Sequence, residues 1–303
     1  MSSESPNQTP DGGVRTVTYA LLRGWLLPND GTGKESRGRT LVVGGSAQTP
    51  GAVLLAGEAA MRAGAGKLQV AAPASSAQHL AVALPEALVL PVPELDDGSL
   101  DPAAADRIAE LAADAAAVLV GPGMVGVEQT MALVRALLPA VSGALVLDAL
   151  GLAVAGDDPA LLRERSGPTV LTPNLAELAI SLHEEPGSLG DDDVAAAVRR
   201  LAGLTGSVVT SGATESFTSA AHGLVWHDLA GGRGLGVSGS GDVLAGAVTG
   251  LAARGAGPEQ AAVWGVHLHR RAGDRLAAEV GRTGFLAREL PGQFPRVLSE
   301  IEV

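Results

Sequence analysis

The sequence predicts an α/β protein in which a mainly parallel sheet is covered by helices on both faces. Strand-like and helix-like segments alternate along most of the 303 residues. The strand-like segments are nearly continuous runs of Val, Ile and Leu, which is typical of strands buried on both faces. No linker or internal repeat divides the chain. We therefore predict a single domain over residues 16–303, preceded by a disordered tail of residues 1–15.

Short apolar runs bounded by Gly, Pro or Asp predict the strands. They are 40–44, 68–72, 87–92, 116–120, 144–148, 169–171, 207–210, 216–220 and 224–227. Helical spacing of apolar residues predicts the helices. They are 51–63, 101–113, 127–138, 175–181, 191–205, 241–254, 258–279 and 286–300. The last two strands can form a hairpin, and Pro291 and Pro295 should disturb the last helix.

Composition excludes several classes of function. The net charge of −12 argues against non-specific nucleic-acid binding but leaves a nucleotide ligand open. The absence of cysteine rules out disulfides, thiolate catalysis and Cys-based metal sites. No stretch has the length and apolarity of a membrane span, and residues 1–13 lack an apolar signal core. We expect a cytoplasmic enzyme without nucleic-acid or membrane partners.

Distinctive polar and Gly-rich segments follow the predicted strands. In mainly parallel sheets, ligands bind beyond the carboxyl ends of the strands. Six segments fall there: 45–51, 121–123, Asp148, 172–174, 211–214 and 236–246. Each segment alone is a weak signal, but their common placement predicts one site at this edge of the sheet.

The segment 236–246, GVSGSGDVLAG, carries the most chemistry. Its small residues would present backbone N–H groups next to the positive end of a helix, which suits a phosphate group. Asp242 would lie in the first turn, where the helix field keeps it ionised. An ionised carboxylate there could accept the proton of a hydroxyl that attacks phosphorus. The alternative is an ordinary Gly-rich turn with an Asp near a helix start.

Seven blocks carry a family resemblance across about residues 34–290. They are LVVGGSAQTPGAVLLAGEAAMRAGAG (41–66), VGPGM (120–124), VLDALGL (146–152), LTPNLAEL (171–178), SGATESF (211–217), GSGDVLAG (239–246) and HLHRRAGD (267–274). In these blocks, and in their order, the chain resembles the bacterial ADP-dependent (S)-NAD(P)H-hydrate dehydratases of the ribokinase-like superfamily. The resemblance implies a three-layer α/β/α ribokinase-like fold with one active site per subunit at the strand ends.

The resemblance also implies a repair reaction on hydrated NADH or NADPH. ADP or ATP, with Mg²⁺, would convert the ring hydroxyl into a phosphate ester, which the lone pair of the ring nitrogen can expel. A stand-alone dehydratase of this kind would depend on a separate NAD(P)H-hydrate epimerase. The family further suggests a homo-oligomer such as a tetramer. Nothing in the sequence identifies Mg²⁺ ligands, since Mg²⁺ often relies on phosphates and waters.

The resemblance assigns roles to individual positions. Asp242 matches the base at the ring hydroxyl, and Ala52, Gly123 and Asn174 match positions that contact the hydrated cofactor. The positions matching nucleotide contacts are Ser211, Gly212, Ala213, Thr214, Glu215, Gly239, Ser240 and Gly241. Purely structural interpretations remain open, because Ala52 could simply start a helix and the Gly-Pro-Gly around Gly123 could be only a turn.

Three positions depart from the family pattern: Asn174 replaces His, Ser211 replaces Lys, and Leu150 replaces Asp. Asn cannot titrate near neutral pH, and Ser removes a positive charge near phosphate. Lys34 and Arg37 could supply charge or could be solvated surface residues. Asn174 and Ser211 keep open the alternative of a weakly catalytic nucleotide-binding protein. The segment 236–246 by itself fits equally well a small-molecule kinase acting on a thiazole, pyrimidine or sugar alcohol.

Three further residues have competing interpretations. Glu177 is either the capping partner of Asn174 or the acidic residue of its block. His267 and His269 are two residues apart on a predicted helix and therefore point to different sides. We read them as packing or surface residues rather than as a metal-binding pair.

Overall fold

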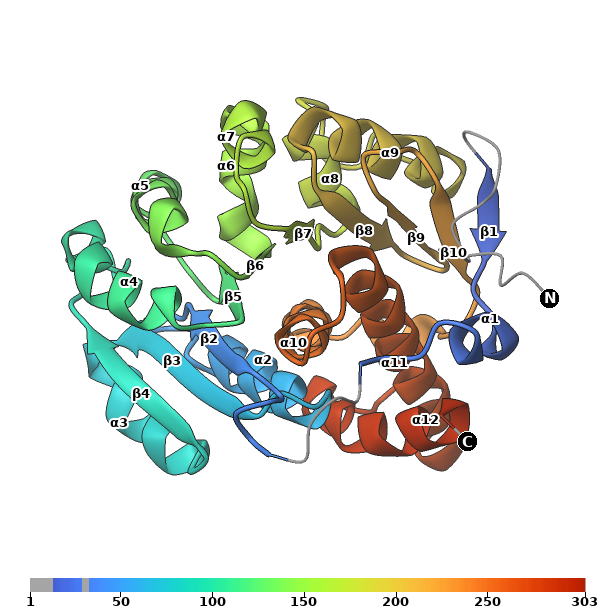
Figure 1. The fold of residues 1–303 in the computed structure, drawn as a ribbon, viewed down its shortest axis with the longest axis horizontal. Coiled ribbons are helices and arrows are strands. Elements are labelled where there is room, and N and C mark those ends of the chain that lie inside the picture. The colour runs from blue at the N-terminus through green and yellow to red at the C-terminus, as the bar shows by residue number, and fades with distance from the viewer. Residues whose placement is uncertain (1–12, 29–32, 303) are drawn as a thin grey trace.

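The computed structural model describes residues 13–28 and 33–302. Its ten-stranded sheet has the order β1-β10-β9-β8-β7-β6-β5-β2-β3-β4 (Figure 1). The strands are β1 Val14–Thr16, β2 Arg39–Val43, β3 Lys67–Pro73, β4 Ala87–Val92, β5 Ala117–Val120, β6 Ala144–Leu147, β7 Thr169–Leu171, β8 Val208–Gly212, β9 Ser216–Ser219 and β10 Val225–Asp228. Within the described part of the chain, only β9 runs against the other strands. The predicted mainly parallel sheet is therefore confirmed.

The described residues also form twelve α-helices, the last three of which follow the final strand. They are α1 Tyr19–Arg23, α2 Gly51–Arg62, α3 Ala74–Ala83, α4 Ala105–Ala113, α5 Val127–Leu137, α6 Ala153–Asp157, α7 Pro159–Arg163, α8 Leu175–Ser181, α9 Val194–Thr205, α10 Ser240–Ala253, α11 Pro258–Glu279 and α12 Phe294–Ile301. Short 3₁₀ turns lie at 102–104, 138–140, 149–152, 191–193, 233–235, 287–289 and 291–293. Those at 287–289 and 291–293 replace the first half of the predicted helix 286–300, because Pro291 begins a new turn there.

Two hydrophobic cores lie on opposite faces of the sheet. One core holds buried residues of α2, α3, α10, α11 and α12, and the other holds those of α4 to α9. Figure 1 shows the sheet curving around α2, α10 and α11. The fold is thus the expected three-layer α/β/α arrangement, and no helix in the described residues is long and apolar enough to cross a membrane.

Several elements differ from the prediction. Val14 and Arg15, which the prediction placed in the tail, belong to β1, which pairs with β10 at the sheet edge. The rest of the predicted tail, residues 1–12, lies outside the described residues. Helices α1, α3, α6 and α7 were not predicted, and β9 pairs antiparallel with β8 as well as with β10. The predicted hairpin of the last two strands is confirmed.

The chain path creates a switch point between β2 and β5. After β2 the chain adds β3 and β4 on one side, then returns to place β5 on the other side of β2. The loops that leave β2 and β5 therefore diverge and open a crevice at the carboxyl ends of the strands. Helix α10 packs closely on α2, because a Cβ at Gly246 or Gly250 would lie 2.2 Å from a backbone oxygen of α2. This packing fixes where α10 begins.

Candidate active site

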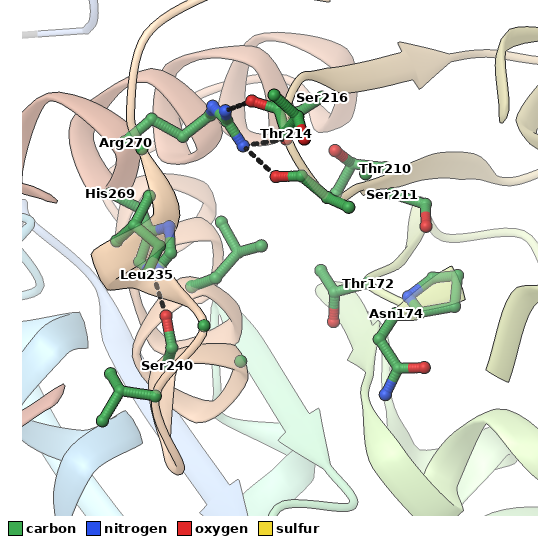
Figure 2. A pocket seen from close by; sticks show the side chains of 18 of the residues that line it. Thr172, Asn174, Thr210, Ser211, Thr214, Ser216, Leu235, Ser240, His269 and Arg270 are labelled. Carbon is green, nitrogen blue, oxygen red and sulfur yellow. Dashed lines mark hydrogen bonds between the residues drawn. The ribbon is translucent and has the colours of Figure 1, made fainter. Parts of the chain in front are cut away.

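A cavity of about 510 Å³, called here the α10 cavity, opens beside the start of α10 (Figure 2). Its walls are residues 172–174 after β7, residues 210–214 at the end of β8 and in the turn that follows, Ser216 at the start of β9, residues 232, 233 and 235–237, residues 240, 241 and 244 of α10, and residues 269 and 270 of α11. No Asp or Glu of the described residues lines it, whereas Arg233 and Arg270 do. The charge of the lining therefore favours an anion.

The first turn of α10 provides the backbone part of this anion site. Gly239 caps the helix in the left-handed conformation, with φ +86°. The leading N–H groups of an α-helix lack helical acceptors and carry the positive end of its dipole. The Ser240 hydroxyl and His269 Nε2 share a hydrogen bond of 2.9 Å, and both side chains are buried. Burial, reinforced by Arg270, lowers the pKa of His269 to about 4, so its ring is neutral at pH 7.

Arg270 holds the loop between β8 and β9 in place. Its guanidinium donates to the backbone oxygens of Ala213 and Thr214 and, at 2.9 Å, to Ser216 Oγ (Figure 2). Its Nε donates to the backbone oxygen of Ala230. Arg270 is buried, and burial lowers its pKa below the ordinary range for arginine. Four of its five N–H donors serve oxygens of the two loops, so Arg270 shapes the cavity wall.

The structure places most of the predicted nucleotide contacts around this cavity. Those that line it are Ser211, Gly212, Ala213, Thr214, Ser240 and Gly241, and Gly239 caps the adjoining helix. Glu215 does not line the cavity, because its carboxylate pairs with His227 Nε2 at 2.6 Å. The buried Ser211 Oγ has no hydrogen-bond partner among the described residues.

Three carboxylates, called here the acidic group, gather beside the same helix start: Asp148, Glu177 and Asp242. Burial raises the pKa of Asp242 to about 6, and the Glu177 carboxylate adds to the rise. We had expected the helix field to keep Asp242 fully ionised. In the structure, loss of solvation and a neighbouring negative charge outweigh that field. Asp242 is still mostly ionised at pH 7, as a base near neutrality requires.

Asp148 carries the larger shift within the acidic group. It is almost fully buried after β6, and burial together with Glu177 and Asp242 raises its pKa to about 8. Thr172 Oγ1 lies 2.7 Å from Asp148 Oδ1 and 3.3 Å from the backbone oxygen of Leu147. Thr172 Oγ1 donates to Asp148 Oδ1, a bond that favours the ionised carboxylate and so opposes the rise in pKa. Burial and the two neighbouring carboxylates outweigh this bond.

Asn174 and Glu177 form a capping box at the start of α8. Asn174 Oδ1 accepts from the Glu177 N–H, and Glu177 Oε2 accepts from the Asn174 N–H, both at 2.9 Å. Burial nevertheless raises the pKa of Glu177. Glu177 therefore serves both as capping partner and as a charge that acts on Asp242. Asn174 lines the cavity and keeps its side-chain NH₂ as a donor.

Ala52 and Gly123 meet at the switch point. A Cβ on Gly123, where φ is +66°, would lie 2.5 Å from the Thr49 carbonyl oxygen and 2.8 Å from the Ala52 Cβ. Thr49 Oγ1 donates to the Gly123 carbonyl at 2.7 Å, which ties the two loops together. Neither Ala52 nor Gly123 lines the α10 cavity. They form a separate corner made largely of backbone.

Other candidate residues lie away from the site or act differently. His267 Nδ1 bonds the buried Asp228 at 2.7 Å, while His269 faces Ser240, so the two histidines point to different sides as predicted. No group of three metal-ligating side chains occurs in the described residues. Lys34 and Arg37 contact Gly66 just before β3, at the amino edge of the sheet. They cannot supply charge to the α10 cavity.

Sequence reasoning missed Arg270 and the part of the loop at residues 232–235. Arg270 lies within the block HLHRRAGD, but its four acceptors are 40 or more residues away along the chain. A basic residue inside an otherwise buried helix was the available signal, since arginine is almost never buried unless it is paired.

Comparison with known proteins places this site in a family. A family model described as NAD(P)H-hydrate dehydratase matches residues 40–296. The ADP-dependent (S)-NAD(P)H-hydrate dehydratase of Xanthomonas campestris is 44% identical over 95% of this chain and 97% of its own length. The bifunctional NAD(P)H-hydrate repair enzyme of Moorella thermoacetica is 34% identical over 95% of this chain, which spans 54% of that relative.

Solved structures agree with the sequence comparison. The ADP/ATP-dependent NAD(P)H-hydrate dehydratase of Bacillus subtilis, co-crystallised with ATP and Mg²⁺, has a TM-score of 0.79 at 26% identity, covering 95% of this chain and 99% of that one. A ribokinase-like superfamily protein of Enterococcus faecalis shares the fold, with a TM-score of 0.75 at 22% identity over 95% and 96% of the two chains. The strand-end site and these matches together show that the chain belongs to the NAD(P)H-hydrate dehydratase family.

Proposed function

We propose that the protein dehydrates (6S)-hydrated NADH and NADPH, using ADP or ATP as phosphoryl donor. The observation that carries the proposal lies at the start of α10. Ser240 and Gly241 line a cavity that favours an anion, and Asp242 is the next residue along the chain. The names of the Xanthomonas and Bacillus relatives support the same reaction. The product is the reduced nicotinamide cofactor, so the enzyme is a lyase that repairs a damaged coenzyme.

The start of α10 separates the two substrates: the nucleotide binds on one side of it, and the hydrated ring meets Asp242 on the other. The nucleotide occupies the α10 cavity, with its phosphate groups at the N–H groups of Ser240 and Gly241. Asp242 takes the proton of the ring hydroxyl, whose oxygen bonds the terminal phosphorus as the bond to the nucleotide's leaving oxygen breaks. The ring nitrogen's lone pair then expels phosphate, and loss of a proton from the adjacent ring carbon restores the double bond.

The hydrated ring lies toward Ala52 and Gly123, where bare backbone leaves room for a flat substrate. Leu55 of α2 lies against Gly239, so this corner and the start of α10 are neighbours. The Asn174 side-chain NH₂ can donate to the substrate or nucleotide from the opposite wall. The described residues offer no cluster that would hold a metal by itself. Mg²⁺ therefore enters on the phosphates of the nucleotide.

The proposal extends to assembly, partner and location. An epimerase on a separate chain supplies the (6S) form, a role consistent with the bifunctional relatives. We also propose a homo-oligomer in the cytoplasm. Sedimentation equilibrium and fractionation of cell extracts measure these two properties.

The test is recovery of the reduced-nicotinamide absorbance. Protein is mixed with (6S)-hydrated NADH or NADPH, Mg²⁺ and either ADP or ATP, and reactions without nucleotide serve as controls. Recovery with at least one nucleotide is expected. If no absorbance returns but an added thiazole, pyrimidine or sugar alcohol becomes phosphorylated, the protein is a small-molecule kinase. If nucleotide binds and neither product forms, it is a nucleotide-binding protein.

A further inference from the structure

The α10 cavity needs a cation for its proposed ligand. A nucleoside diphosphate carries several negative charges, and the acidic group of Asp148, Glu177 and Asp242 lies beside the same helix start. The chain as a whole has a net charge of −12. Ser211 contributes a hydroxyl and no charge to the cavity wall. Mg²⁺ carried on the phosphates and the backbone N–H groups would offset part of this repulsion, but Lys34 and Arg37 lie at the far edge of the sheet and add no charge here.

Of the three basic side chains in the cavity lining, His269, Arg270 and Arg233, one is left as a cation that could bind phosphate. His269 is neutral at pH 7, since its pKa is about 4. Arg270 is buried, and its nitrogens already serve four oxygens of two loops. Releasing it for a phosphate would leave those buried acceptors unpaired, which is costly. Arg233 is exposed and lines the cavity, and its side chain makes no hydrogen bond or ion pair with any residue that the structure describes.

The loop that carries Arg233 is anchored on both sides of it. The Gly231 N–H donates to Asp274 Oδ1 at 3.1 Å, and Leu235 packs against Gly273 of α11. Between them, Gly234 sits so close to the Phe285 ring that an added Cβ would be 2.3 Å away. The backbone at Arg233 is therefore held at the cavity wall, and only its long side chain is left to move. A guanidinium carried by a fixed backbone can donate two parallel hydrogen bonds to two oxygens of a phosphate group.

We propose that Arg233 binds the phosphate groups of the nucleotide and supplies the positive charge that Ser211 does not. This inference rests on the proposed function, because it takes a nucleoside diphosphate as the ligand of the cavity. It adds a binding residue in a loop that the family resemblance did not assign. Arg270 keeps its structural role, and the two arginines of the lining thus divide between building the cavity and holding its ligand.

The test compares the affinities of ADP, AMP and adenosine by titration calorimetry. In R233Q the Kd for ADP should rise about tenfold or more, as expected for loss of a charge-assisted phosphate contact. Adenosine should bind R233Q and wild type within about twofold, because it carries no phosphate. R233K should keep part of the ADP affinity. The ADP affinity of R233Q should also depend less on salt than that of wild type.

R282Q is the matched control. Arg282 is exposed and contacts the same loop through its backbone oxygen near Gly234, but it does not line the cavity. Its loss removes the same net charge and should leave the Kd for ADP within about twofold. Equal ADP affinities of R233Q and R282Q would overturn the assignment, as would an equal loss of ADP and adenosine binding by R233Q. A wild-type protein that binds no ADP would overturn the proposed nucleotide site itself.

Discussion

The α10 cavity and the acidic group share one helix N-terminus but carry opposite kinds of charged group. The cavity is lined by two arginines, a neutral histidine and backbone. The acidic group holds three carboxylates, of which Asp148 and Asp242 have pKa values raised to about 8 and about 6. The contrast teaches that one helix start can serve anion binding on one side and proton transfer on the other. Burial and the neighbouring Glu177 carboxylate raise the pKa of the base, and no carboxylate of the described residues lines the phosphate's cavity.

The largest expected effect comes from removing the base. Asp242→Asn should lower turnover by about 10²–10⁴-fold, because the ring hydroxyl loses its proton acceptor. The ADP affinity should not fall, since the cavity lining is unchanged. Asp114→Asn is the control, because Asp114 is exposed at the opposite edge and forms its ion pair there with Arg39. Turnover by the absorbance assay and affinity by calorimetry check both statements, and a fully active Asp242→Asn protein would remove Asp242 from the base role.

The second effect concerns stability and tests whether Asp148 is neutral. The pKa of Asp148 is raised on folding, so the folded state holds more protons than the unfolded state between about pH 4 and pH 8. Its contribution to stability therefore falls as pH rises through that window. With about 1.4 kcal/mol per pKa unit over the roughly three units between the unfolded pKa and pH 7, the cost is on the order of 4 kcal/mol at pH 7. Asp148→Asn mimics the neutral acid and should remove this cost.

Urea denaturation of wild type and Asp148→Asn at several pH values measures the difference. The two free energies of unfolding should nearly coincide at pH 4 and separate progressively toward pH 8, with the variant more stable. Glu110→Gln, an exposed change on α4, should show no such divergence. A variant that is less stable than wild type at pH 8 would mean that Asp148 is an ionised, partnered carboxylate.

The smallest effect probes the coupling inside the acidic group. The rate should rise with pH through about 6 as Asp242 ionises. Glu177→Gln removes the neighbouring negative charge while glutamine can still complete the capping box. The midpoint of the acid limb of kcat/KM should then move to lower pH by roughly one unit or less. An unchanged midpoint would show that burial alone sets the pKa of Asp242.

The sequence predicted the helices and strands more completely than it predicted the site. The predicted helices 175–181 and 258–279 have the bounds of α8 and α11, because clear apolar spacing and a capping residue or Pro marked their ends. Strand β1 is three residues with only its middle residue partly buried, so no pattern marked it. Helices α6 and α7, five residues each, are too short for periodicity to show.

Within the site, the strand-end segments were predicted because chain order alone places them at one edge. The protonation of Asp148 and the hydrogen bonds of Arg270 to the two loops were not predicted, because both depend on burial and on partners distant in sequence. The charge of Asp242, 94 residues along the chain, raises the pKa of Asp148, and Arg270 donates a hydrogen bond to the distant Ala213. Spacing in a sequence carries no information about the solvation that such contacts remove.

The four bonds of Arg270 have a consequence for how the site opens. One guanidinium ties the loop after β8 to the loop after β10, through Ala213, Thr214 and Ser216 on one side and Ala230 on the other. Each loop is bonded to the same guanidinium, so a displacement of Arg270 releases both loops at once. The two segments therefore form one cooperative unit of local unfolding. Amide hydrogens in both loops should exchange with solvent at a common rate, set by release of a single side chain.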